Sequence, residues 1–419
     1  MVHDQNIPNK MKIFAIAFAC EPERPSEPGI GWSVVGELVK SHDLTVLTRA
    51  NNREVIERYL EKHPDDNHNR IDWKYFDLWE WFHKLKKRLP GGIQLYHELW
   101  QLFAARKFRD SFKEYDIVHH LIFGGVFFTP WAARYSKRFV WGPIGGALGA
   151  MEPSFLKKES KGAFFGEWLY GMVSRYSYRP LGFVRKLRDK ATAILFRTSE
   201  LAGKLALAPG QFSAVVPESA YEGDVAPKTY ADEIHPLRMV SIGRIVTLKG
   251  LYYTIMAFAR YIRNGGSGDY HIFGDGPLKD EMARLAEKEG VSGYVVFHGN
   301  DPHAKVLESL KGCDVLLHGS FREGASWTIL EGMANGLPVV CQARAGMVDM
   351  VPPDCGTPIK AASPDELIEA MSSAMMDYYR NPGLVKKHGT AGAERVAGVY
   401  RWPAIVSSIN EMYSRVMEK

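Results

Sequence analysis

Short strands that are apolar along their whole length constrain this chain more than any other feature. Five of them follow one another in the second half, separated by segments of helical spacing such as 250–262 and 278–290: 238–244 (RMVSIGR), 270–276 (YHIFGDG), 294–299 (YVVFHG), 314–319 (DVLLHG) and 337–341 (LPVVC). A strand without polar alternation is buried on both faces, as in a parallel sheet covered by helices on each side. The pattern predicts an α/β, doubly wound domain, and such domains bind ligands at the carboxyl ends of their strands.

The first half shows the same alternation less clearly. Its predicted strands are 12–18, 43–49, 116–120, 139–142 and 191–198, and a helix is predicted at 32–40. With 419 residues the chain is too long for one core, so two Rossmann-like domains are expected. We place them at 1–205 and 237–402, joined by the proline-containing connection 206–236 and followed by a helix, 403–419, that could pack back on the first domain.

Composition predicts a globular protein of the cytoplasm. The four cysteines (Cys20, Cys313, Cys341 and Cys355) show neither disulfide nor metal-ligand spacing, which favours buried thiols in a reducing compartment. No apolar run approaches the roughly 20 residues that span a bilayer, and the polar start does not resemble a signal peptide. The net charge is +5, but no nucleic-acid-binding motif accompanies it, so no nucleic-acid partner is expected.

Glycines near the first predicted helix raise the question of nucleotide binding. The segment PGIGWSVVG (28–36) places Gly29 and Gly31 near a helix start, loosely as in the dinucleotide fingerprint. That fingerprint follows its strand directly and has an acidic partner after the second strand, whereas here a loop intervenes and the second strand ends in Arg49, which argues against NAD. The glycines either let a loop turn into the helix or let the backbone approach an anionic ligand.

Charged residues gather at strand ends in the second domain. Arg244 and Lys249 lie in SIGRIVTLKG (241–250), where they are either solvated loop charges or a pair that neutralises a pyrophosphate. Glu323 and Glu331 stand on either side of a predicted helix start in FREGASWTILEGMANGLPVV (321–340). Two carboxylates at the same sheet edge require cations or hydroxyl donors nearby. The two glutamates therefore favour a ligand-binding role for Arg244 and Lys249 over solvated loop charges.

These features resemble retaining glycosyltransferase family 4, whose GT-B fold has two Rossmann-like domains facing one another across a cleft. The resemblance is carried by PGIGW, GRIVTLKG, FGDGPL and the two glutamates in their sequence context. It implies that Glu323 contacts hydroxyls of a donor sugar, that Glu331 binds the ribose, and that Arg244 and Lys249 face the diphosphate. Eight residues of helix span about 12 Å, which suits groups at opposite ends of a pyrophosphate. The other implied donor-binding residues are motif glycines and a helix start, where phosphate is favoured: Gly29, Gly31, Gly243, Gly274, Gly276, Gly324, Ala325, Ser326, Trp327 and Thr328.

The implied activity is retaining transfer of a sugar from a UDP- or GDP-linked donor to a glycan or lipid-linked acceptor, as in bacterial cell-surface polysaccharide synthesis. No Asp-x-Asp occurs in the chain, and metal-dependent glycosyltransferases use such carboxylates to hold a divalent ion. We therefore expect neither metal nor cofactor, with Arg244, Lys249 and the helix end stabilising the leaving diphosphate. A non-catalytic sugar-nucleotide-binding scaffold and a GT-B epimerase remain alternatives.

Two features depart from the family pattern. Members often carry a histidine at a strand end near the donor sugar, and DIVHHLIFGG (116–125) offers His119 and His120, either as catalytic residues or as plain hydrogen-bonding residues. The segment VVPESAY (215–221) replaces the family's usual Pro-Asn-Gly turn, which leaves the contacts of that loop open.

Basic residues concentrate in 84–113 and 155–190, which together hold seventeen Lys and Arg against five Asp and Glu. In the second stretch they alternate with aromatic residues, a combination that suits the headgroup boundary of an anionic membrane, although a basic face over an aromatic core would look the same. The protein could therefore bind peripherally at the inner face of the membrane, and Lys157, Lys158, Arg185 and Lys186 are the cations expected to contribute.

Overall fold

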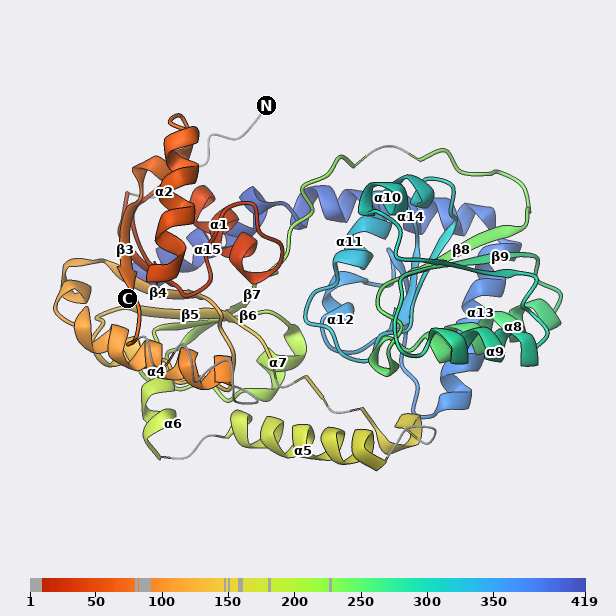
Figure 1. The fold of residues 1–419 in the computed structure, drawn as a ribbon, viewed down its shortest axis with the longest axis horizontal. Helices are drawn as coiled ribbons and strands as arrows, with labels where there is room; N and C mark the ends of the chain where they lie inside the picture. The colour runs from red at the N-terminus through yellow and green to blue at the C-terminus, as the bar shows by residue number, and fades with distance from the viewer. Residues whose placement is uncertain are drawn as a thin grey trace. The chain divides into compact units, whose positions relative to one another are not determined.

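The computed structural model describes residues 10–79, 82, 92–146, 148–149, 151–156, 161–179, 182–225 and 228–419. Its contacts divide the chain into two compact units, each with its own sheet (Figure 1). Unit 1 comprises 1–147, 173–218 and 402–419, and unit 2 comprises 148–172 and 219–401.

Unit 1 is built on a seven-stranded sheet in the order β3-β2-β1-β4-β5-β6-β7, in which all neighbours are parallel. The strands are β1 (Lys12–Ala17), β2 (Asp43–Arg49), β3 (Asp72–Phe76), β4 (Ile117–Ile122), β5 (Phe139–Ile144), β6 (Ala193–Phe196) and β7 (Phe212–Val215). The helices are α1 (Glu27–Leu38), α2 (Arg53–Lys62), α4 (Gly92–Lys107), α6 (Gly182–Arg188), α7 (Ser199–Lys204), α15 (Trp402–Met417) and the second part of α5 (Lys161–Tyr178), which begins in unit 2.

Unit 2 has a six-stranded parallel sheet in the order β10-β9-β8-β11-β12-β13. Numbered from its own first strand, this is the 3-2-1-4-5-6 order of the Rossmann fold. The strands are β8 (Leu237–Ile242), β9 (Gly268–Phe273), β10 (Val295–Gly299), β11 (Val315–His318), β12 (Val339–Gln342) and β13 (Gly356–Ile359). The helices are α8 (Leu251–Arg263), α9 (Lys279–Lys288), α10 (His303–Leu310), α11 (Trp327–Ala334), α12 (Met347–Met350), α13 (Pro364–Arg380) and α14 (Pro382–Val399).

The central strands of unit 2 bury both faces, which confirms the predicted fold class. In β11, Val315 and Leu317 belong to a core cluster with α8 and α13, whereas Leu316 belongs to a separate cluster with α11. Neighbouring residues of this strand therefore enter opposite cores, which is why Val315, Leu316 and Leu317 are all apolar. The predicted buried thiols are also observed, since all four cysteines are free and buried.

Three strands were not predicted, and each lies at an edge of its sheet: β3, β7 and β13. An edge strand has one neighbour and less cover, so it lacks a continuous apolar run; β3 and β7 contain no fully buried residue. In β13, Gly356 and Pro358 further weaken the strand pattern.

The units differ in detail from the expected domains. Residues 148–172 group with unit 2, although the sequence analysis placed them in the first domain, and the expected connection 206–236 contains β7, which extends the sheet of unit 1. Helix α15 belongs to unit 1 and packs on α1 and β7.

Candidate functional site

The strand order of unit 2 reverses between β8 and β11, and the loops after these two strands form the candidate site. Ligands of doubly wound sheets bind at this switch point. The two loops are in close contact: a Cβ on Gly250 would lie 2.1 Å from the carbonyl oxygen of Gly319, and Gly250 has a φ of 64°. A side chain at Gly250 would therefore push the loops apart and strain the backbone.

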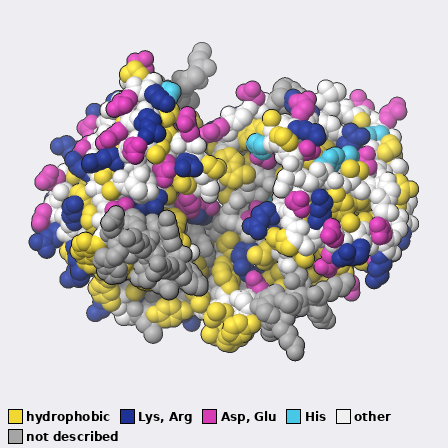
Figure 2. Space-filling view, viewed as in Figure 1, with side chains coloured by type: hydrophobic (Ala, Val, Ile, Leu, Met, Phe, Trp, Pro, Cys, Tyr) yellow, Lys and Arg dark blue, Asp and Glu magenta, His cyan; other side chains and the backbone are white. Residues whose placement is uncertain are grey.

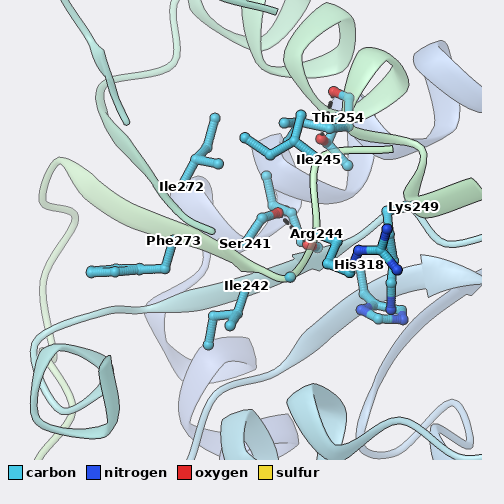
Figure 3. A pocket seen from close by; sticks show the side chains of 13 residues that line it. Ser241, Ile242, Arg244, Ile245, Lys249, Thr254, Ile272, Phe273 and His318 are labelled. Atoms are coloured by element: carbon cyan, nitrogen blue, oxygen red, sulfur yellow. Dashed lines mark hydrogen bonds between the residues drawn. The ribbon is translucent and has the colours of Figure 1, made fainter. Parts of the chain in front are cut away.

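A pocket opens at the carboxyl ends of β8, β9 and β11 (Figure 3). Three nitrogen-bearing side chains lie together on one side of it: Arg244 and Lys249 from the loop after β8, and His318 from the end of β11. The opposite side is apolar and is formed by Ile242, Ile272 and Phe273. The pocket thus has a cationic side and an apolar side.

Glu323 supplies the buried anion of this site. Its side chain is 11% exposed, and its Oε1 accepts a hydrogen bond from Nζ of Lys249 in an ion pair. Nε2 of His318 lies 3.4 Å from Oε2 of Glu323. The His318 ring is buried, and its Nε2 makes no hydrogen bond to any described residue, so this contact is electrostatic.

The charge state of Glu323 follows from these neighbours. Burial by itself would raise the pKa of the carboxyl, but the His318 imidazole and the Lys249 ammonium together hold that pKa well below its ordinary value. The group is therefore a carboxylate at neutral pH, and a carboxylate only accepts hydrogen bonds. It can receive hydroxyl donors of a ligand while remaining paired with Lys249.

Arg244 differs from Lys249 in having no anion to pair with. Its side chain is exposed at the mouth of the pocket and forms no ion pair or hydrogen bond with any residue that the structure describes. An incoming anion would meet the Arg244 guanidinium first and would share Lys249 with Glu323. A planar guanidinium suits the oxygens of a phosphate.

Helix α11 begins after Glu323 and not at it. Residues 323–326 are non-helical, Ser326 is the N-cap, and the helix starts at Trp327. The estimate of about 12 Å assumed eight helical residues, whereas the residues from Glu323 to Ser326 are not helical. The backbone N–H of Ser326 already contacts Sδ of Met350 at 3.3 Å, whereas the N–H groups of the first helical turn have no acceptor within the helix. Of the predicted N–H donors in 325–328, that of Ser326 thus already has a partner, and anion binding by this segment remains a prediction.

Glu331 lies further along α11 and is 8% exposed. Its Oε1 lies 2.7 Å from Nε2 of His303, the first residue of α10, whose side chain is 68% exposed. The carboxylate therefore lies beneath a solvent-facing imidazole, which a ligand hydroxyl would have to displace. The predicted ribose contact of Glu331 remains a prediction.

The motif glycines of unit 2 have a packing role. A Cβ on Gly274, whose φ is 132°, would lie 2.0 Å from the carbonyl oxygen of Gly243, and one on Gly276 would lie 2.4 Å from that of Ile245. Backbone hydrogen bonds join the same two loops, with 2.9 Å between the N–H of Gly243 and the carbonyl of Phe273. These glycines let the loop after β9 support the loop that carries Arg244, and direct contact with a donor remains a prediction.

The predicted loop PGIGW is helical in the structure. Helix α1 begins at Glu27, five residues before the expected start at Trp32, so Gly29 and Gly31 lie in its first turns. A Cβ on Gly29 would lie 2.0 Å from the carbonyl oxygen of Arg24, and one on Gly31 would lie 2.3 Å from that of Ala19. Close packing of α1 on the preceding loop therefore explains both glycines without a ligand.

His119 and His120 lie in β4 and are both buried. Nε2 of His119 lies 2.5 Å from the carbonyl oxygen of Gly142, so it carries the proton, and Nδ1 accepts a hydrogen bond from the Tyr413 hydroxyl at 2.6 Å. Burial lowers the pKa of His119 to about 3 and that of His120 to about 4. His119 thus has both ring nitrogens engaged within unit 1, which supports the hydrogen-bonding alternative for this residue.

Two histidines of the site were not predicted from the sequence. His318 is the next-to-last residue of the predicted strand 314–319 and lies at the same sheet edge as Arg244, so its position near the strand end was an available signal. His303 is 28 residues from Glu331, and no local pattern relates the two. Across the described ranges, no group of three or more His, Cys, Asp or Glu side chains has the geometry to hold a metal ion.

Residues 233–391 match the family model described as glycosyl transferases group 1. Among curated relatives, the chain is 30% identical over 122 residues to a colanic acid biosynthesis glycosyltransferase, WcaL, of Salmonella typhimurium; the match covers 28% of this chain and 30% of that protein. The aligned part is thus about a third of the length of the first relatives matched.

Solved structures resemble the chain over nearly its whole length. The lipopolysaccharide outer core galactosyltransferase WaaB is 15% identical, with a TM-score of 0.60 over 97% of this chain and 100% of that one. HepE of Anabaena, solved with UDP, is 16% identical with a TM-score of 0.56, again over 97% of this chain and 100% of that one. The chain therefore has the GT-B fold, with two Rossmann-like domains. The match to the group 1 glycosyl transferase model, residues 233–391, lies within unit 2.

The buried ion pairing of Glu323 predicts a pH-dependent stability difference. A carboxyl whose pKa is depressed on folding adds stability above its unfolded pKa and loses that stability as the pH falls below the ordinary value of 4.5. Urea unfolding should show the wild type to be more stable than Glu323→Gln at pH 6, with a smaller difference at pH 3.5. Glu308→Gln, which removes a largely exposed carboxylate on α10, is the matched control. A difference that stays constant across this pH range would contradict the ionised, paired state.

Proposed function

We propose that this chain is a glycosyltransferase that takes a sugar from a nucleoside diphosphate donor bound at the switch point of unit 2. The observation that carries the proposal is the ionised, buried Glu323 between Lys249 and His318, next to the unpaired Arg244. The carboxylate can accept hydrogen bonds from sugar hydroxyls, and the neighbouring cations can face phosphate oxygens. This combination suits a ligand with a sugar at one end and a diphosphate next to it. The match of residues 233–391 to the glycosyl transferase family model supports the same chemistry.

The cations and the start of α11 suit the diphosphate of the donor. Arg244 pairs with no carboxylate among the described residues, Lys249 lies close enough to contribute, and a helix N-terminus favours negative charge. A solved neighbour contains UDP, which supports a nucleoside diphosphate, with UDP and GDP as the expected forms. Glu331, on the second turn of α11, is the residue proposed to bind the ribose hydroxyls.

We further propose retaining transfer without a metal ion. The acceptor oxygen would form its bond to the anomeric carbon on the face from which the diphosphate departs, and the acceptor proton would pass to a diphosphate oxygen. Arg244, Lys249 and the start of α11 would stabilise the developing negative charge, which is the role that a metal ion has elsewhere. Turnover should then persist in EDTA, whereas a strict requirement for magnesium or manganese would contradict this part of the proposal.

The acceptor is proposed to be a glycan or lipid-linked glycan of bacterial surface polysaccharide synthesis, handled in the cytoplasm at the inner face of the membrane. Support comes from two proteins that the chain is similar to, one described in colanic acid biosynthesis and the other in the lipopolysaccharide outer core. A thermal-shift screen of UDP, GDP and their sugar conjugates is the first test, because a ligand of the native state raises the melting temperature. Binding without release of the nucleoside diphosphate would favour the non-catalytic alternative.

Removal of Arg244 should weaken the diphosphate site. A charge-assisted contact to phosphate contributes roughly 1.5–3 kcal/mol, so Arg244→Ala should lower turnover and nucleotide affinity by at least about tenfold. Lys249→Ala should have an effect of similar size, although it also removes the partner of Glu323. Arg284→Ala on the exposed side of α9 is the matched control and should leave both quantities unchanged. Near-normal kinetics and calorimetric affinity in both site variants would refute the phosphate assignment.

The two glutamates should separate binding from turnover. Glu331→Ala should mainly weaken affinity for the free nucleoside diphosphate, because its proposed partner is the ribose. Glu323→Gln should mainly lower the turnover number, because its proposed partner is the reacting sugar. Calorimetry with the nucleotide alone and steady-state kinetics with the sugar conjugate measure the two effects separately. If Glu331→Ala leaves affinity for the free nucleotide unchanged, the ribose assignment is wrong.

A further inference from the structure

Helix α5 presents an apolar row of side chains to solvent. The row follows the spacing i, i+3, i+4, i+7, i+8 and i+11, which is one face of an α-helix. Its exposed fractions are those of surface residues: Phe165 61%, Trp168 52%, Leu169 44%, Met172 47%, Val173 47% and Tyr176 60%. The yellow side chains at the lower edge of Figure 2 lie where Figure 1 shows α5. Scattered apolar residues are common on surfaces, but a continuous row marks an interaction surface.

The opposite side of α5 is polar and faces protein. Glu167 forms an ion pair with Arg322 and accepts a hydrogen bond from the backbone N–H of Met151 at 2.9 Å. The Arg322 guanidinium also lies 3.8 Å from the ring centroid of Tyr170. Further along, Ser174 and Ser177 are buried. An ordinary surface helix buries its apolar side and exposes its polar side. In α5 the polar side contacts protein and the apolar side faces solvent.

The charges on α5 favour a membrane over another protein surface as the occupant. Glu167 is the one carboxylate among the described side chains of α5, and Arg322 neutralises it. The exposed charges at its C-terminal end are the cations Arg175 and Arg179. Helix α6 adds exposed Lys186 and also Arg185, which is 3.8 Å from Asp189. Aromatic rings in an apolar row beside cations suit the boundary between headgroups and acyl chains. Lys157 and Lys158, also expected to contribute, lie outside the described residues.

We propose that α5 is an interfacial membrane anchor whose apolar row inserts into the headgroup boundary of an anionic bilayer. In this arrangement α5 would lie in the plane of the interface. No helix in the part of the chain that the structure describes is long and apolar enough to cross a membrane. Insertion would add a hydrophobic contribution that salt does not screen to the electrostatic attraction of the cations. This anchor would be the physical basis for the proposed location at the inner face of the membrane. The membrane anchor does not depend on the donor site.

The test is sedimentation of the full chain with phosphatidylcholine vesicles that contain or lack phosphatidylglycerol. The wild type should bind the anionic vesicles and keep part of that binding at high salt. Trp168→Ser/Met172→Ser should lower the partition coefficient at least about tenfold, because two inserted side chains are replaced by polar ones. Ile234→Ser/Tyr294→Ser, which changes two exposed apolar residues elsewhere in unit 2, is the matched control and should bind like the wild type.

Two further measurements separate the possible results. The melting temperature of the Trp168→Ser/Met172→Ser variant should match that of the wild type, which shows that the variant is folded. Its nucleotide-induced thermal shift should also be unchanged, because the donor site is independent of the anchor. Trp168→Phe should still bind vesicles but show less fluorescence quenching by brominated acyl chains. Equal vesicle binding by wild type and double variant, or binding abolished entirely by salt, would overturn the insertion of α5. Concentration-dependent dimerisation that the double variant abolishes, without vesicle binding, would instead identify a second copy as the occupant and overturn the proposal.

Discussion

The buried carboxylate of Glu323 connects the two loops on which the candidate site depends. Lys249 comes from the loop after β8, and His318 and Glu323 come from the end of β11 and the loop after it. An ionised group with little solvent is stable only where positive or hydrogen-bonding partners surround it. The pairing therefore fixes the relative position of the loops at the point where the strand order reverses, and Arg244 and the start of α11 are held beside it.

The backbone makes this arrangement possible. Gly250 and Gly319 let the two loops touch, and Gly274 lets the loop after β9 support the one that carries Arg244. At each of these positions a Cβ atom would clash with the backbone of the neighbouring loop. Only glycine therefore allows the loops to approach this closely. A motif comparison would assign these glycines to ligand contact, but the structure shows that close packing of the loops requires them. This packing in turn positions the side chains that can contact a ligand.

In helix α5, too, the packing of some residues determines which others are left free to contact a partner. Its polar residues are engaged with Arg322 and with the backbone of Met151, so the apolar residues between them are left facing solvent. An exposed apolar row is unfavourable in water and favourable at a bilayer interface. The donor site lies in unit 2, and the anchored part of α5 belongs to the same unit. A single domain would therefore carry both the sugar donor and part of the membrane contact.

The sequence by itself determined the class of fold and the edge of the sheet where the site lies. Uniformly apolar strands can only be buried on both faces, and the charges that follow β8 and β11 must then meet at their carboxyl ends. Edge strands such as β3 were not predicted because a strand with one neighbour and partial cover needs no continuous apolar run.

Only the tertiary structure decided which groups pair: Lys249 is 74 residues from Glu323, and His303 is 28 residues from Glu331. It also engaged both ring nitrogens of His119 inside unit 1 and turned the apolar side of α5 outward. Periodicity reports how far a segment is buried, whereas a contact between distant residues depends on how loops and helices pack, which no local pattern records.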